Sequence, residues 1–186
     1  MAGRDKMGES VDASWLERRD ELRAIEDWRV EGKLALKAGR DGYNGTLSWE
    51  QFGTETDFRF RGPFGFGGFR IHGDADRLRL KTTTGTDVYL DDPEADMQER
   101  FGWSIPVYSM RYWIVGVSDP DEPATEIVDD SGFLTELEQH GWSVTYDGYR
   151  EHEGYLFPRK VVMERADVRI RMVADRWELF ADDESP

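Results

Sequence analysis

The hydrophobic residues near the start of the chain recur at helical spacing. Ser14 and Glu17 have the arrangement of a capping box, with a hydroxyl at the cap and a carboxylate three residues later. The apolar residues that follow keep helical spacing among charged ones: Trp15, Leu22 and Ile25. The pattern predicts an amphipathic helix over residues 14–26, preceded by a flexible tail at residues 1–13.

From Trp28 the period of the pattern changes to two. Apolar and polar residues alternate along residues 28–37 and again along residues 43–49. We expect Asp41-Gly42, between these runs, to form a hairpin turn. Further short strands are indicated by pairs of apolar residues two positions apart: Phe58 and Phe60, Phe69 and Ile71, Leu78 and Leu80, Val88 and Leu90. This arrangement is typical of an antiparallel meander.

Two helical signals then interrupt the strands. Asp92 before Pro93 supplies a cap residue and a first-turn proline, and Gly102 is a natural stop. A second helix is expected from Ile105-Pro106 to Gly116, followed by an acidic, proline-containing loop over residues 118–125. The period of two then returns near the end of the chain: Trp142, Val144 and Tyr146, Val161 and Met163, and Val168 to Trp177.

These elements predict an α+β fold built on a curled antiparallel sheet. Each alternating strand has one apolar face, which must be covered, and the helices from residues 93 and 106 are natural lids for it. An incompletely filled interior would be an apolar cavity. We expect a single domain over residues 14–180 and a disordered acidic tail at residues 181–186.

Composition narrows the classes of function. The chain has 186 residues, 38% of them hydrophobic, and its 39 acidic and 24 basic side chains give a formal net charge of −15. That charge disfavours nucleic-acid binding and electrostatic adhesion to an anionic membrane, so any membrane contact should be apolar and local. The absence of cysteine excludes disulfides, thiolate metal sites and a cysteine nucleophile. No apolar run is long enough to span a membrane, and the polar N-terminus lacks the apolar region of a signal peptide.

Known catalytic and metal-binding patterns are missing. There is no Gly-x-Ser-x-Gly motif, and the acidic pairs Asp74/Asp76 and Asp129/Asp130 lack the layout of a calcium loop, so we interpret them as solvated turns. Three histidines lie far apart without metal-ligand spacing, and surface or rim positions are expected for them: His72, His140 and His152. The sequence therefore predicts no catalytic residue, metal or cofactor.

The glycine-rich segment Arg61–Phe69 is the most unusual part of the sequence. It has no Gly-Lys-Ser/Thr ending, which argues against phosphate binding. One interpretation is a tight hairpin whose phenylalanines lie in the core, and composition alone favours it. The other is a loop that presents Phe64, between Pro63 and Gly65, at an exposed tip as an apolar foot for a membrane or an acyl chain.

A series of short motifs spanning about residues 14–178 resembles the LolB family, in the family's order. LolB proteins are outer-membrane receptors that accept lipoproteins from a periplasmic carrier in Gram-negative bacteria. The motifs are Trp28-x-x-x-Gly32-Lys33-Leu34, Leu47-Ser48-Trp49, Gly62-Pro63-Phe64-Gly65, Asp92-Pro93-Glu94, Gly102-x-x-x-Pro106-Val107, Trp113-Ile114-x-Gly116, Gln139-x-Gly141-Trp142-x-Val144-x-Tyr146, Pro158 and Trp177.

The resemblance implies a fold, a function and partners. It implies an eleven-stranded half-barrel with a helical lid, whose apolar cavity holds the acyl chains of an incoming lipoprotein. By position, Pro63, Phe64 and Gly65 correspond to the family's protruding loop, which is used to deliver lipoproteins into the membrane. The implied partners are lipoproteins, a LolA-like periplasmic carrier and the inner leaflet of the outer membrane, with no nucleic acid. The implied protein is a monomer at the periplasmic face of the outer membrane.

Candidate cavity residues are the apolar positions of the strands and the lid. For each of them an ordinary core position is the alternative that alternation leaves open. Met110 and Met172 would suit acyl chains of variable shape, because thioether side chains repack easily. The candidates are Leu34, Leu36, Leu47, Trp49, Phe58, Phe60, Ile71, Val107, Met110, Trp113, Trp142, Val144, Ile170 and Met172.

The family pattern also raises the question of an anchor. Family members are normally lipoproteins, with a signal peptide and an acylated cysteine, and this sequence contains neither. We expect either that the N-terminal residues are the linker after such an anchor or that the protein acts as an unanchored periplasmic form. Three alternatives to a receptor stay open: a soluble carrier, a scaffold with a filled core, and an enzyme with a polar site around Tyr146, Glu164 or Arg171.

Overall fold

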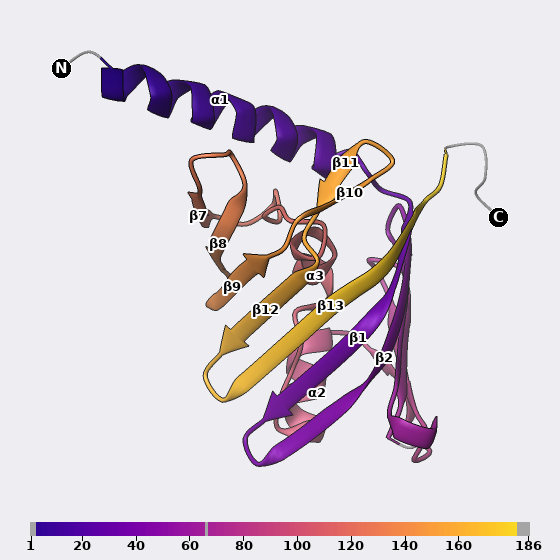
Figure 1. Ribbon diagram of the computed structural model, residues 1–186. Helices are drawn as coiled ribbons and strands as arrows, with labels where there is room; N and C mark the ends of the chain where they lie inside the picture. The colour runs from indigo at the N-terminus through magenta and orange to yellow at the C-terminus, as the bar shows by residue number, and fades with distance from the viewer. Residues whose placement is uncertain (1–2, 66, 182–186) are drawn as a thin grey trace.

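The fold is a single curled sheet with helices in its concavity. The computed structural model describes residues 3–65 and 67–181. Eleven antiparallel strands follow the order β6-β5-β4-β3-β2-β1-β13-β12-β9-β8-β7, so the two edge strands do not meet and the sheet is not closed into a barrel (Figure 1). Their bounds are β1 Trp28–Ala38, β2 Asp41–Phe52, β3 Glu55–Arg61, β4 Phe69–Gly73, β5 Leu78–Thr82, β6 Asp87–Leu90, β7 Ala124–Val128, β8 Leu134–Gln139, β9 Trp142–Asp147, β12 Lys160–Arg165 and β13 Val168–Leu179. The expected curled antiparallel sheet is thereby confirmed.

The first and last strands pair at the centre of the sheet. β1 and β13 are antiparallel neighbours over nearly their whole length, with one register shift between Glu31 and Gly32. At this bulge the two backbones approach so closely that a Cβ on Gly32 would lie 2.0 Å from the carbonyl oxygen of Val173. Only glycine fits there without a shift of the backbone.

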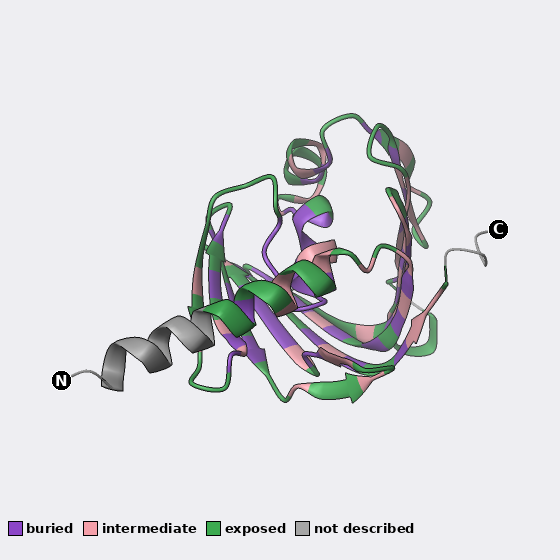
Figure 2. Ribbon diagram, turned by 90° about the horizontal axis from the view of Figure 1, so that it is seen from above, coloured by how far each residue is buried: buried purple, intermediate pink, exposed green. Residues whose placement is uncertain are grey.

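Two helices lie in the concavity of the sheet (Figure 2). α2 spans Pro93–Phe101, and α3 spans Val107–Trp113. The side chain of Asp92 accepts a hydrogen bond from the Ala95 N–H, and Gly102 ends α2 in the left-handed conformation. The predicted cap, first-turn proline and stop of α2 are all confirmed, because these local signals act within one helical turn.

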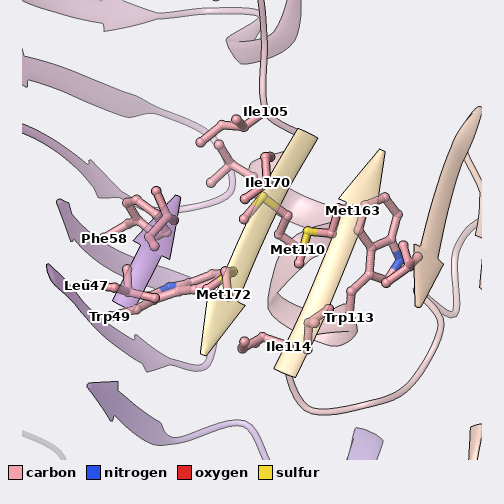
Figure 3. Packing of buried hydrophobic residues seen from close by; sticks show 14 of the residues in the cluster. Leu47, Trp49, Phe58, Ile105, Met110, Trp113, Ile114, Met163, Ile170 and Met172 are labelled. Atoms are coloured by element: carbon pink, nitrogen blue, oxygen red, sulfur yellow. The ribbon is translucent and has the colours of Figure 1, made fainter. Parts of the chain in front are cut away.

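The interior between the sheet and the helices is filled with side chains. Trp28 packs edge-on against Trp49 and Trp177, at centroid distances of 5.2 and 5.4 Å. From the helical side, Met110 of α3 lies near Met163 and the neighbouring strand β13 (Figure 3).

The N-terminal helix differs from the prediction. α1 spans Gly3–Arg23, so residues 3–13 of the expected tail are helical and Ser14 is inside the helix rather than at its cap. A capping box favours a helix start but does not prevent the backbone from hydrogen-bonding through it, and residues 3–13 contain no proline to stop the helix. The second half of α1 contacts the sheet edge, where the Arg18 guanidinium donates to the Gly132 carbonyl at 2.7 Å.

Other differences concern turns and strands. The first hairpin turns at Gly39-Arg40, because Ala38 pairs with Asp41, so Asp41-Gly42 begins β2 instead of forming the turn. β7 begins inside the predicted loop, and β7 and β8 were both missed. β7 is an edge strand with no buried side chain, and its register with β8 shifts, so neither strand keeps a clean alternation. A separate hairpin, β10 Arg150–His152 and β11 Tyr155–Phe157, was also missed. Residues 182–186 of the expected tail lie outside the described residues.

None of the described helices is both long enough and apolar enough to cross a membrane.

The close backbone approach at Gly32 gives a stability prediction. Gly32→Ala should lower the free energy of unfolding by about 1–3 kcal/mol, because the new Cβ must push β1 and β13 apart. Gly42→Ala is the matched control, since a Cβ there meets nothing within 4 Å. It should change the free energy by less than about 1 kcal/mol in either direction. Urea unfolding of both variants measures the difference, and equal values would contradict this account.

Candidate functional site

The loop between β3 and β4 carries an exposed aromatic side chain. Phe64 is 98% exposed, in a short helical turn, η1 (Pro63–Gly65), where its φ of 56° lies in the left-handed region. The turn is closed by a hydrogen bond from the Gly65 N–H to the Gly62 carbonyl. The preference from composition for a core position is therefore wrong for Phe64. Phe60, four residues earlier on strand β3, does face the core.

The base of this loop is fixed to the neighbouring β5–β6 turn. The Gly68 N–H donates to the Thr83 hydroxyl at 3.1 Å, and the Thr83 N–H donates to the Gly68 carbonyl at 3.0 Å. The loop therefore projects from a defined position at one end of the sheet. An exposed phenylalanine held on such a turn loses no contact within the protein when it enters an apolar phase.

An apolar pocket lies at the base of the same loop. Its volume is about 220 Å³, and it separates the end of the sheet from α2 and the segment that follows α2. Gly67 and Gly68 belong to its wall, so the pocket and the Phe64 loop are contiguous. The apolar lining residues are Tyr43, Phe69, Leu80, Met97, Phe101 and Trp103.

These lining residues are not among the predicted cavity residues. Phe101 and Trp103 flank Gly102, the stop of α2, and Met97 is four residues after Pro93 on the buried face of the helix. The sequence signal that could have identified them is their position, beside the stop of a lid helix or on its inner face. Tyr43 belongs to the alternating run of residues 43–49, but it lies near the start of β2, before the alternation in burial begins.

All fourteen predicted cavity residues are buried in one hydrophobic cluster, each at most 5% exposed. They come from both the sheet and the lid, and the close-up shows the packing of several of them (Figure 3). None of the fourteen lines the apolar pocket at the loop. The structure thus brings them together on the concave side of the sheet, and a role in ligand binding stays a prediction.

One arginine of the sheet makes two polar contacts with α2 and the segment that follows it. Arg165, at the end of β12, forms an ion pair with Glu94 of α2 at 3.2 Å and donates to the Ser104 hydroxyl at 2.9 Å. Both charged side chains are about one third exposed, at 33% and 34%. Such half-exposed pairs contribute little to stability, so they can fix a position without preventing movement.

The base of α3 is fixed by a buried network. The Trp113 indole N–H donates to the Gln139 side-chain oxygen at 2.8 Å, and the Gln139 amide donates to the Asp119 carbonyl at 2.9 Å. Buried and fully bonded groups of this kind hold their elements rigidly. We therefore expect α2 to be the more movable of the two lid helices.

The proposed polar residues of an enzyme site are not brought together. Tyr146 is buried, and desolvation raises the pKa of its hydroxyl well above the ordinary value. Glu164 and Arg171 lie on the opposite, solvent-facing side of the same sheet. Among the described side chains, no group of three or more His, Asp or Glu residues is placed to hold a metal ion.

The predicted histidine positions agree with the structure. The three lie on separate elements, with His140 exposed and the other two partly exposed.

The fold defines the class of the protein, an unclosed half-barrel with helices in its concavity. A LolA superfamily protein from Nitrosomonas europaea superimposes with a TM-score of 0.59 at 12% identity, covering 91% of this chain and 93% of the other. A DUF1329 family protein from Desulfovibrio piger superimposes with a TM-score of 0.58 at 8% identity, covering 92% and 94%. At such identities the likeness concerns the fold alone.

Sequence comparison gives the particular family. The family described as "Outer membrane lipoprotein LolB" matches residues 26–177, and the chain belongs to the LolB family. A protein from Nitrosococcus oceani named "Outer-membrane lipoprotein LolB" is 35% identical over 167 residues, which are 89% of this chain and 83% of the relative. A protein of the same name from Stutzerimonas stutzeri is 31% identical over 89% and 81%. The resemblance drawn from the sequence motifs is confirmed.

The exposure of Phe64 predicts that its side chain contributes little to the stability of the fold. Phe64→Glu should leave the free energy of unfolding within about 0.5 kcal/mol of the parent value. Phe58→Ala should lower it by about 3–5 kcal/mol, because Phe58 is 1% exposed and packs against Trp49. Urea unfolding measures both, and a large loss in the Phe64 variant would mean that the loop is packed in solution.

Proposed function

We propose that the protein accepts lipoproteins from a LolA-like periplasmic carrier and inserts them into the outer membrane. It would act as a monomer at the periplasmic face of that membrane, binding the acyl chains of the lipoprotein in its apolar interior. The observation that carries the proposal is the position of Phe64: a fully exposed aromatic side chain beside an apolar pocket that is partly lined by α2. Membership of the LolB family supports the same role.

The energetics of acyl chains require a closed route. Each buried methylene group contributes about 0.8 kcal/mol, so releasing several acyl chains into water would cost tens of kcal/mol. Direct contact between the openings of carrier and receptor avoids that exposure. Nucleotide hydrolysis is unnecessary if affinity for the chains rises from carrier to receptor to bilayer.

The acyl chains would enter at the pocket and displace the lid. A volume of about 220 Å³ is smaller than the roughly 300–1,000 Å³ of most small-molecule sites. The bound state therefore needs α2 to move, and the weak Arg165–Glu94 contact permits this. The fourteen concave-face residues would then line the enlarged cavity, and Met110 and Met172 would adapt their conformations to the chains.

The Phe64 loop would act in the last step. Once the loop touches the membrane, Phe64 partitions into the acyl boundary and holds the pocket opening against the bilayer. The chains then pass from the pocket to the lipid phase without crossing water. A soluble carrier has no need of such a loop, and this feature favours a receptor over a shuttle.

Phe64→Glu should separate acceptance of a lipoprotein from its delivery. Purified carrier loaded with a labelled lipoprotein is mixed with the protein, and the label is followed by size-exclusion chromatography and then by flotation with liposomes. The variant should accept the label normally, because Phe64 makes no contact with the interior. It should deliver at least about tenfold less label to liposomes, because a carboxylate does not enter the acyl region.

Two results would contradict the proposal. The receptor role fails if the parent protein takes no label from its cognate carrier. The role of the loop fails if Phe64→Glu delivers as well as the parent protein. Phe64→Leu is the matched control, since an aliphatic side chain should retain delivery.

A pair of tyrosines tests the location of the pocket. Tyr43→Ala should weaken binding of a fluorescent fatty acid by about three- to tenfold, because Tyr43 lines the pocket. Tyr89→Ala is the control, since Tyr89 is similarly exposed but lies under Arg77 at the edge strand β6. Fluorescence titration measures both affinities. Equal effects would mean that the acyl chains enter elsewhere.

A further inference from the structure

Three cations form a row across the outer face of the sheet, next to the Phe64 loop. Arg59 of β3 lies directly opposite Arg70 of β4, and Arg70 lies directly opposite Lys81 of β5. Like charges in directly opposed positions repel and destabilise a sheet. Placing three of them in register therefore has a cost to folding.

One carboxylate partly compensates this row. Asp57 accepts hydrogen bonds from the Nε and Nη2 atoms of Arg70 at 2.8 and 2.7 Å, and it also bonds Arg59. Burial alone would raise the pKa of Asp57, but the bonds from the two arginines outweigh it and lower the pKa. The pair of guanidinium groups is thus held in a fixed orientation, with one negative charge for two positive ones.

Arg61 extends the row to the loop itself. It is exposed, it precedes Pro63 by two residues, and it forms no ion pair with any described residue. Arg59, Arg61, Arg70 and Lys81, here called the cation row, line an open depression of about 650 Å³. Gly65, next to Phe64, is part of its wall.

The positive charges of this region affect the pKa of His72. Burial lowers the pKa of His72, and the charges of Arg70, Lys81 and Arg79 lower it further, against Asp57, which raises it. Elsewhere on the outer face of these strands, Asp87 neutralises Arg79 through two hydrogen bonds. Within the row, only Arg59 and Arg70 contact Asp57, and Lys81 has a distant contact with Asp87 at 3.8 Å. A chain with a net charge of −15 has therefore concentrated positive charge at the place where Phe64 projects.

We propose that the cation row binds the phosphate groups of anionic phospholipids when the Phe64 loop enters a membrane. The inference rests on the proposed function and names the surface that its last step recognises. Arginine and lysine side chains reach the headgroup region while a neighbouring apolar side chain occupies the acyl boundary. A guanidinium group can donate two parallel hydrogen bonds to two oxygens of one phosphate.

Two features of the protein make such a row necessary for membrane binding: its exposed loop phenylalanine and its negative net charge. A single inserted side chain binds membranes weakly, and stable binding takes a second signal. The net charge repels an anionic surface in every other orientation, so the row would also turn the pocket opening toward the bilayer. Each cation near an anionic surface should strengthen binding about fivefold.

The test uses vesicle co-sedimentation without any lipoprotein. One set of vesicles is phosphatidylcholine alone, and the other is a three-to-one mixture of phosphatidylcholine and phosphatidylglycerol. The parent protein should bind the mixture at least about fivefold more tightly than phosphatidylcholine, and raised salt should remove the difference. The double variant Arg61→Gln/Lys81→Gln should bind the mixture at least about tenfold more weakly than the parent, while retaining its affinity for phosphatidylcholine.

A matched control variant shows whether the effect comes from the cation row or from the change in net charge. Arg150→Gln/Arg159→Gln removes the same charge from exposed positions outside the row and should stay within about twofold of the parent on both vesicles. Circular dichroism and urea unfolding verify that each variant is folded. Arg59 and Arg70 are left unchanged, because removing either would alter the Asp57 contacts.

Three outcomes would overturn the inference. The first is equal binding of the parent to both vesicle types, and the second is equal weakening of vesicle binding by the two double variants. The third is an Arg61→Gln/Lys81→Gln variant that binds vesicles normally but no longer binds the carrier. The last would assign the row to an acidic protein surface. Failure of the proposed function is distinguishable, because it appears as a lack of lipoprotein transfer from the carrier, which the vesicle assay does not involve.

Discussion

Burial of the concave face of the sheet is the constraint on which the other features depend. Trp28, Trp49 and Phe58 place large apolar surfaces on that face, and an open sheet cannot hide them by closing on itself. The segment between β6 and β7 therefore crosses the concavity as two helices. This cover is a segment separate from the strands, and α2 is held to the sheet by its buried Met97 and by the partly exposed Arg165–Glu94 ion pair.

The same constraint explains why the functional features gather at one end of the sheet. The lid leaves an apolar pocket where α2 meets the ends of β4 and β5, and the β3–β4 loop projects from that end. The cation row lies on the same strands, at the alternate positions whose side chains face outward. One short stretch of chain, from β3 to β5, thus presents an apolar tip, part of the pocket wall and a positive face within a protein of strongly negative net charge.

Local signals predicted the elements well where the physics is local. Asp92, Pro93 and Gly102 fixed α2, since a cap, a first-turn proline and a left-handed stop act within one turn. Alternation predicted the strands whose single buried face is continuous. It failed for the edge strand β7, which buries no side chain, and the capping box at Ser14 did not mark the start of a helix that continues through it.

The sequence by itself determined the α+β class, the strand-rich order, the lid helices and the family, because periodicity, caps and ordered motifs are properties of neighbouring residues. For Phe64, composition favoured a core position and the resemblance implied a protruding loop. The sequence left open which apolar residues surround the pocket and how Arg59, Arg70 and Lys81 are related. Only the tertiary structure decided these points. Side-chain exposure on a turn depends on what packs above it, pocket walls come from distant segments such as Tyr43 and Phe101, and cross-strand neighbours are set by register.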